Sequence, residues 1–107
     1  LFPPVATRSR ARWAGLDPAD FALITTYDNS SFCKPNPDYY REILGKMELA
    51  PEDCLMVGND VGDDMPAKDI GMQVFLLTEN LINKTENGID CYPNGDYGKL
   101  KSFLETI

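Results

Sequence analysis

The most informative stretch of the sequence is residues 54–64, which read CLMVGNDVGDD. Its first five residues form an unbroken apolar run that ends in glycine, a pattern typical of a parallel strand buried on both faces. Residues 73–77, QVFLL, predict a second buried strand. A short helix is predicted between them near residues 65–70, with Gly71 closing it. The order strand, helix, strand predicts an α/β domain with a parallel sheet.

The rest of the chain carries weaker signals of the same kind. Further helices are predicted over residues 5–13, 38–47 and 97–105. The last of these should turn Leu100, Phe103 and Leu104 inward. Further strands are predicted at residues 21–26, FALITT, and weakly at residues 89–91, with a turn at residues 93–95.

Length and composition exclude several classes of function. The chain has 107 residues, enough for one domain, and 10 basic against 17 acidic side chains give a net charge of −7. This balance argues against nucleic acid, because phosphate backbones attract basic surfaces, and no run approaches a membrane helix in length. Histidine is absent, which excludes Ser-His-Asp and Cys-His catalysis and histidine-ligated zinc. Three cysteines at long, unequal spacings fit the reduced thiols of a cytoplasmic protein.

Three carboxylates follow the first apolar strand, at Asp60, Asp63 and Asp64. Carboxylates this close repel one another, and a divalent cation between them lowers that cost. Oxygen ligands of this kind suit Mg²⁺, which takes one or two carboxylates together with water and substrate phosphate. The alternative is a solvated turn in which Asp63 or Asp64 caps the helix that follows.

A lysine lies in another polar loop, at residues 33–40, which read CKPNPDYY. Ligands of parallel sheets bind beyond the carboxyl ends of the strands. Since this loop follows the strand predicted at residues 21–26, we expect Lys34 to meet the acidic loop at one sheet edge. A fixed cation opposite a metal neutralises the charge of a phosphoryl group. The alternative is a solvated surface lysine.

The two loops resemble motifs of a known family. Residues 33–40 look like the K-P-x-P-x-x-[FY] third motif of the haloacid dehalogenase-like (HAD) hydrolase superfamily. Residues 57–64, VGNDVGDD, followed by Ala67, Gly71 and Met72, resemble its fourth motif. The resemblance implies a Rossmann-like three-layer sandwich with a parallel sheet, a HAD-like core that is incomplete at its N-terminus.

The resemblance also implies roles for particular residues. Lys34 would orient a nucleophilic aspartate, stabilise its phosphorylated form and contact the substrate phosphate. The acidic motif implies a Mg²⁺ site at Asp60, with Asp63 or Asp64 as the second ligand. The alignment is ambiguous by one residue, because Asn59 could occupy the first acidic position and lie at the phosphate, leaving Asp63 as the carboxylate four residues on.

Two motifs of the family are absent from the sequence, namely the nucleophile motif D-x-D-x-T and the second-motif Ser or Thr. We therefore expect residues 1–107 to be the C-terminal part of a single HAD-like core domain. In the family, the nucleophile strand lies beside the strand equivalent to residues 54–58, so residues 21–26 would lack a neighbour in the sheet and strand edges would be open. The resemblance predicts a piece that is unstable or bound to its missing N-terminal half. Too few residues precede Lys34 for a cap domain between the second and third motifs.

The function implied is a Mg²⁺-dependent phosphohydrolase that acts on a small phosphorylated metabolite through an aspartyl-phosphate, in the cytoplasm, with no nucleic-acid or membrane partner. The missing segment would supply the nucleophile. One alternative within the family is a metal-independent dehalogenase, against which the three-carboxylate loop argues. The alternative from another class is a non-catalytic Mg²⁺-binding or regulatory α/β module.

Overall fold

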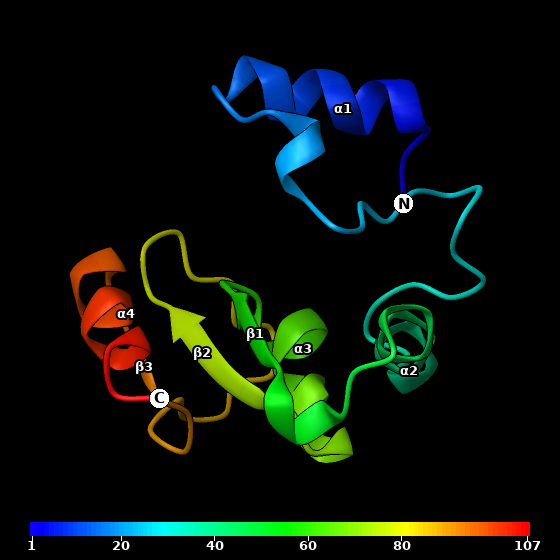
Figure 1. Ribbon diagram of the computed structural model, residues 1–107. Helices are drawn as coiled ribbons and strands as arrows, with labels where there is room; N and C mark the ends of the chain where they lie inside the picture. The colour runs from blue at the N-terminus through cyan, green and yellow to red at the C-terminus, as the bar shows by residue number, and fades with distance from the viewer. The chain divides into compact units, whose positions relative to one another are not determined.

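The computed structural model describes all 107 residues and divides into two compact units, Leu1–Met47 and Glu48–Ile107. The second unit contains a parallel sheet of three short strands in the order β1-β2-β3 (Figure 1). Strand β1 is Leu55–Gly58, β2 is Gln73–Leu77 and β3 is Asn94–Gly95. The α/β class with a parallel sheet is thereby confirmed, while the third layer of the expected sandwich stays a prediction.

The connection between β1 and β2 is helical, as the sequence predicts. Helix α3, Val61–Asp64, continues into the 3-10 helix η3, Met65–Ile70, and both contact the sheet. Gly71 ends η3 with φ +98°, a left-handed conformation that costs glycine little because it has no Cβ. Strands β1 and β2 pair in parallel, with Met56 opposite Val74.

The C-terminal helix α4, Tyr97–Leu104, packs on β2 and β3. The side chain of Asp96 caps it by accepting from the Lys99 N–H at 2.9 Å, and the rings of Phe103 and Phe75 are 5.2 Å apart. The expectation that Leu104 faces inward is wrong, since it is 49% exposed. The helix ends at this residue, so its side chain lies past the turn that carries Phe103 onto the sheet.

The third strand lies where the sequence indicates a turn. Residues 89–91, predicted as a weak strand, instead form a turn closed by the Tyr92 N–H to the Ile89 carbonyl. The next residues pair with β2, because the Leu76 N–H bonds to the Pro93 carbonyl and the Thr78 N–H to the Gly95 carbonyl. Hydrogen bonds to β2 thus make residues 94 and 95 a strand, although an Asn-Gly pair locally prefers a turn.

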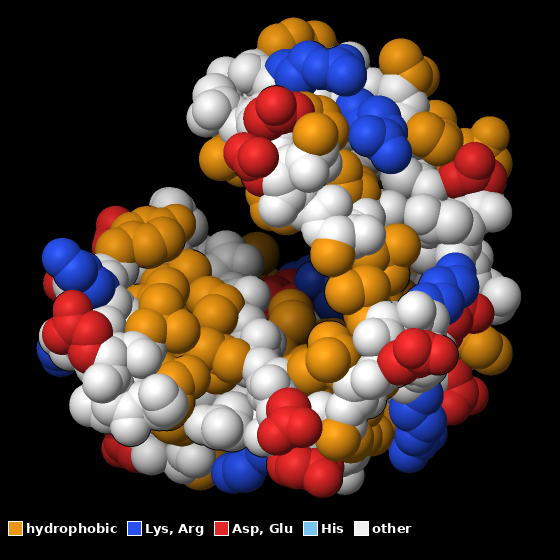
Figure 2. Space-filling view, in the orientation of Figure 1, with side chains coloured by type: hydrophobic (Ala, Val, Ile, Leu, Met, Phe, Trp, Pro, Cys, Tyr) orange, Lys and Arg blue, Asp and Glu red, His pale blue; other side chains and the backbone are white.

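The first unit contains two α-helices, α1, Pro4–Trp13, and α2, Pro37–Met47, and a 3-10 helix, η1, Pro18–Asp20. Both α-helices are confirmed within one residue of their predicted starts, and α2 buries Tyr40 and Leu44. The arginines of α1, Arg8, Arg10 and Arg12, are exposed, and basic side chains are visible over this helix in Figure 2.

The strand predicted at residues 21–26 is wrong. Phe21 is 48% exposed, and the segment is irregular, with a bend at Ala22 and no ladder partners, although Thr26 at its end is buried. Its backbone groups bond to a side chain instead: Asn29 accepts from the Thr26 N–H and donates to the Ile24 carbonyl, both at 2.8 Å. A β-strand needs a neighbouring strand for those groups, and here the amide of Asn29 takes that place.

Crossing a membrane requires a long apolar helix, and none of the helices described here meets that requirement.

Candidate functional site

The acidic loop begins where β1 ends. Asp60 directly precedes α3, and its Oδ1 accepts a hydrogen bond from the Asp63 N–H at 3.1 Å. The helix therefore starts with a side-chain cap, which satisfies one of its unpaired N–H groups. The alternative in which Asp63 or Asp64 does the capping is corrected, because the capping carboxylate belongs to Asp60.

Asp64 is buried, with 3% of its surface exposed. Its Oδ2 accepts from the Asp60 N–H at 3.1 Å, so the side chain reaches back over the loop to the end of β1. Gly58 makes this approach possible: a Cβ there would lie 2.7 Å from the Cβ of Asp64 and would overlap its carboxyl group. A glycine is thus required at the last residue of β1, because the carboxylate occupies the space of its side chain.

The loop is fastened on its other side by a segment far along the chain. The Ile82 N–H bonds to the Asn59 carbonyl at 2.8 Å, and the Val61 N–H bonds to the Ile82 carbonyl at 2.9 Å. The Asn59 side-chain amide donates to the Asn80 carbonyl at 2.9 Å. Asp60 and Ile82 form an isolated parallel bridge. This contribution could not be predicted from the sequence, because an Asn-Leu-Ile-Asn segment carries no periodic signal.

The predicted metal ligands can be compared with what Mg²⁺ requires. No group of three or more His, Cys, Asp or Glu side chains in the chain is arranged to hold a metal ion. The carboxylates of Asp60 and Asp64 are each oriented by a backbone N–H within one five-residue loop. This pair fits the one or two carboxylates that Mg²⁺ usually takes from a protein, with water and phosphate completing its shell.

The lysine loop belongs to the first unit. Lys34 is half-buried and lies inside a turn of residues 33–36, which is closed by a hydrogen bond from the Asn36 N–H to the Cys33 carbonyl at 3.0 Å. Asn36 then starts α2, with its side chain accepting from the Asp38 N–H at 2.9 Å. The lysine therefore lies in the turn that leads into α2. That it meets the acidic loop at one sheet edge stays a prediction.

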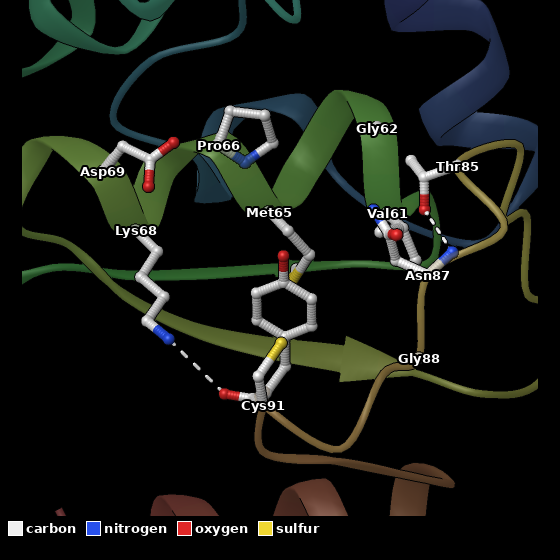
Figure 3. A pocket seen from close by; sticks show the side chains of 11 residues that line it. Val61, Gly62, Met65, Pro66, Lys68, Asp69, Thr85, Asn87, Gly88 and Cys91 are labelled. Carbon is white, nitrogen blue, oxygen red and sulfur yellow. Dashed lines mark hydrogen bonds between the residues drawn. The ribbon is translucent and has the colours of Figure 1, made fainter.

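The second unit also has a cavity of about 560 Å³, between α3, η3 and the loop after β2 (Figure 3). Lys68 donates to the Cys91 carbonyl at 3.4 Å, and its ammonium lies 5.4 Å from the centre of the Tyr92 ring. Burial, with the nearby Cys91 and Asp69, raises the pKa of Tyr92. The lining includes Val61 and Gly62 but none of the carboxylates of the acidic loop, so the cavity is separate from the candidate metal site.

A model of the family described as haloacid dehalogenase-like hydrolases matches residues 3–71, more than half of the chain. The chain belongs to this family. Membership of the superfamily is thus confirmed, whereas the placement of its third and fourth motifs in the two loops stays a prediction.

The chain is similar to two phosphatases, one by sequence and one by structure. It is 32% identical over 90 residues to a glyceraldehyde 3-phosphate phosphatase from Methanothermobacter thermautotrophicus, covering 78% of this chain and 40% of that protein. The crystal structure of a HAD phosphatase from Thermococcus onnurineus matches with a TM-score of 0.72 at 21% identity, over 95% of this chain and 46% of that one. The structural likeness shows the HAD fold, and the chain spans less than half the length of either relative.

Proposed function

We propose that residues 1–107 are the C-terminal part of the core of a Mg²⁺-dependent HAD phosphatase, which hydrolyses a small phosphorylated metabolite through an aspartyl-phosphate intermediate. The glyceraldehyde 3-phosphate phosphatase among its relatives supports both the reaction and the small substrate. In this proposal the nucleophilic aspartate comes from outside residues 1–107, because the D-x-D-x-T pattern does not occur in them.

The observation that carries the proposal is the buried carboxylate of Asp64 above Gly58. A carboxylate buried this far is costly unless hydrogen bonds or a cation compensate for its lost hydration. Here it lies at the carboxyl end of a parallel strand, which is where ligands bind in sheets of this class, and Asp60 is one helical turn away. These two residues are the proposed Mg²⁺ ligands, with Asp63 as a further candidate.

Each remaining residue has a proposed task. The bound Mg²⁺ would neutralise charge on the phosphoryl group. Lys34 offsets negative charge on the same group as it passes to the aspartate, and orients that aspartate. Asn59 lies next to the metal ligands and faces the phosphate side in this proposal, with its orientation maintained by the Asn80 carbonyl.

The first prediction is that the chain on its own does not hydrolyse phosphate esters, because the proposed nucleophile is absent from it. The measurement is release of p-nitrophenol from p-nitrophenyl phosphate in the presence of Mg²⁺. Turnover above the buffer blank that disappears in Lys34→Ala would contradict the proposal, since the chain would then contain its own nucleophile.

The second prediction separates the acidic loop from other surface carboxylates. Asp60→Ala should weaken Mg²⁺ binding in the complete protein by at least about tenfold, since losing even an outer partner of a metal site typically costs about 10–100-fold. Asp53→Ala is the matched control, because Asp53 is exposed in η2, Pro51–Asp53, before β1 and thus at the opposite strand end. Titration calorimetry measures both. Equal affinities would show that Asp60 is a helix cap only.

A further inference from the structure

The segment before Lys34 is anchored to α2 by a charged side chain. The Ser31 N–H donates to Glu42 Oε1 at 2.8 Å, across eleven residues of sequence. Glu42 is in the second turn of α2, and 20% of its side chain is exposed. A hydrogen bond to a carboxylate is about twice as strong as one between neutral groups. The middle of the lysine loop is therefore bonded to a rigid helix.

A second anchor comes from the next turn of the same helix. Lys46 donates from its ammonium to the Asn29 carbonyl, and its Nζ lies 3.8 Å from Glu42 Oε1. The Ser31 N–H, together with this ammonium, lowers the pKa of Glu42 and keeps it ionised. An exposed ion pair contributes little by itself. What distinguishes this pair is that both side chains also hold backbone groups of the loop.

The ends of the loop are fastened as well. Asn29 bonds to the preceding segment through the Thr26 N–H and the Ile24 carbonyl, and Asn36 closes the turn that leads into α2. Lys34 lies between Ser31 and Asn36, so its backbone is restrained from both directions. A lysine has four rotatable side-chain bonds, and an ordered backbone is needed before its ammonium can be directed at one point.

We propose that Glu42 and Lys46 are positioning residues for Lys34, and that they fix the lysine loop on α2 so that its ammonium is aimed at the phosphoryl group. This inference rests on the proposed function, because it takes Lys34 to be the residue that acts on the phosphate. Neither Glu42 nor Lys46 contacts substrate in this proposal. They act through the backbone of residues 29–31.

The test compares two substitutions of Glu42 in the complete protein. Glu42→Ala removes the acceptor of the Ser31 N–H, and we expect kcat to fall by about tenfold to a hundredfold with KM little changed, since a displacement of about 1 Å can cost a hundredfold. Glu42→Gln keeps an acceptor oxygen and should retain most of kcat. Arg41→Gln is the matched control, because it breaks an exposed pair with Asp38 on the same helix. Circular dichroism checks that each variant is folded.

Amide hydrogen exchange at Ser31 provides a readout that does not depend on activity. The exchange rate should rise at least about tenfold in Glu42→Ala, because the Ser31 N–H then loses its acceptor, and it should not change in Arg41→Gln. No rise in exchange would overturn the inference, and so would a rise with kcat unchanged while Lys34→Ala still loses activity. If Lys34→Ala itself keeps full activity, the proposed function fails, and the positioning role fails with it.

Discussion

Replacing Lys34 by alanine in the complete protein is expected to lower kcat by about 10²–10³-fold, or roughly 3–4 kcal/mol, which is the typical loss for one electrostatic contact to a transition state. An ammonium that stabilises the transferring phosphoryl group acts more strongly in the transition state than in the ground state, so kcat should fall rather than KM merely rise. Lys34→Arg should restore little activity, because a planar guanidinium does not replace a compact ammonium at a tight site. Steady-state kinetics measures all three proteins.

A surface lysine gives the control for this experiment. Lys84 is exposed in the loop after β2, and Lys84→Ala should leave kcat unchanged. Circular dichroism would show whether Lys34→Ala stays folded, so that a loss of activity is not a loss of structure. If Lys34→Ala kept kcat within about threefold, which is under about 0.7 kcal/mol, the solvated-lysine alternative would stand.

Strands β1 and β2 of the second unit were predictable because their signal is local. The run before Gly58 and the run at residues 73–77 are apolar enough to need burial, and they became β1 and β2. Residues 21–26 have a similar composition but form no strand. Apolar residues favour a strand, yet the strand exists only where another backbone supplies ladder partners, and sequence periodicity does not report those partners.

The candidate site divides in the same way. Asp60 and Asp64 could be predicted as candidate ligands because they come directly after an apolar strand. The cap made by Asp60 is also local, since it accepts from the Asp63 N–H three residues later. The bonds that hold Asn59 come from Asn80 and Ile82, more than 20 residues later in a polar loop. Such a contact depends on how the chain returns to the sheet edge, and neither spacing nor composition records it.

The role of Gly58 became visible only with the side chain of Asp64 in place. Glycine at the end of an apolar strand is expected for any tight turn. The structure gives it a more specific reason, which is that the Asp64 carboxyl lies where a Cβ would be. Glycine is required at residue 58 because of where the Asp64 side chain lies. The sequence shows both residues but does not show that they are in contact, so this requirement could not be predicted from it.

Gly58→Ala should therefore destabilise the chain and displace Asp64. The new methyl group would overlap a carboxyl that is buried and bonded to the Asp60 N–H, so either β1 or the acidic loop has to shift. Overpacking of this kind typically costs about 1–3 kcal/mol, and a displaced Asp64 would lose its place beside Asp60. Urea unfolding of the parent and of Gly58→Ala measures the loss of stability. Mg²⁺ titration of the complete protein measures the change in Mg²⁺ affinity at the proposed site.

Gly62→Ala is the matched control, because it makes the same chemical change four residues later in the same unit. A Cβ on Gly62 would lie 3.6 Å from Asp60 Oδ1, an ordinary contact distance, and the residue is inside α3. Alanine is favoured over glycine in a helix by roughly 0.5–1 kcal/mol, so this variant should be as stable as the parent or more so. Gly58→Ala should thus have a lower free energy of unfolding than Gly62→Ala. Equal stability of Gly58→Ala and Gly62→Ala would mean that the Asp64 carboxyl does not occupy the space above Gly58, and the observation that carries the proposed metal site would be lost.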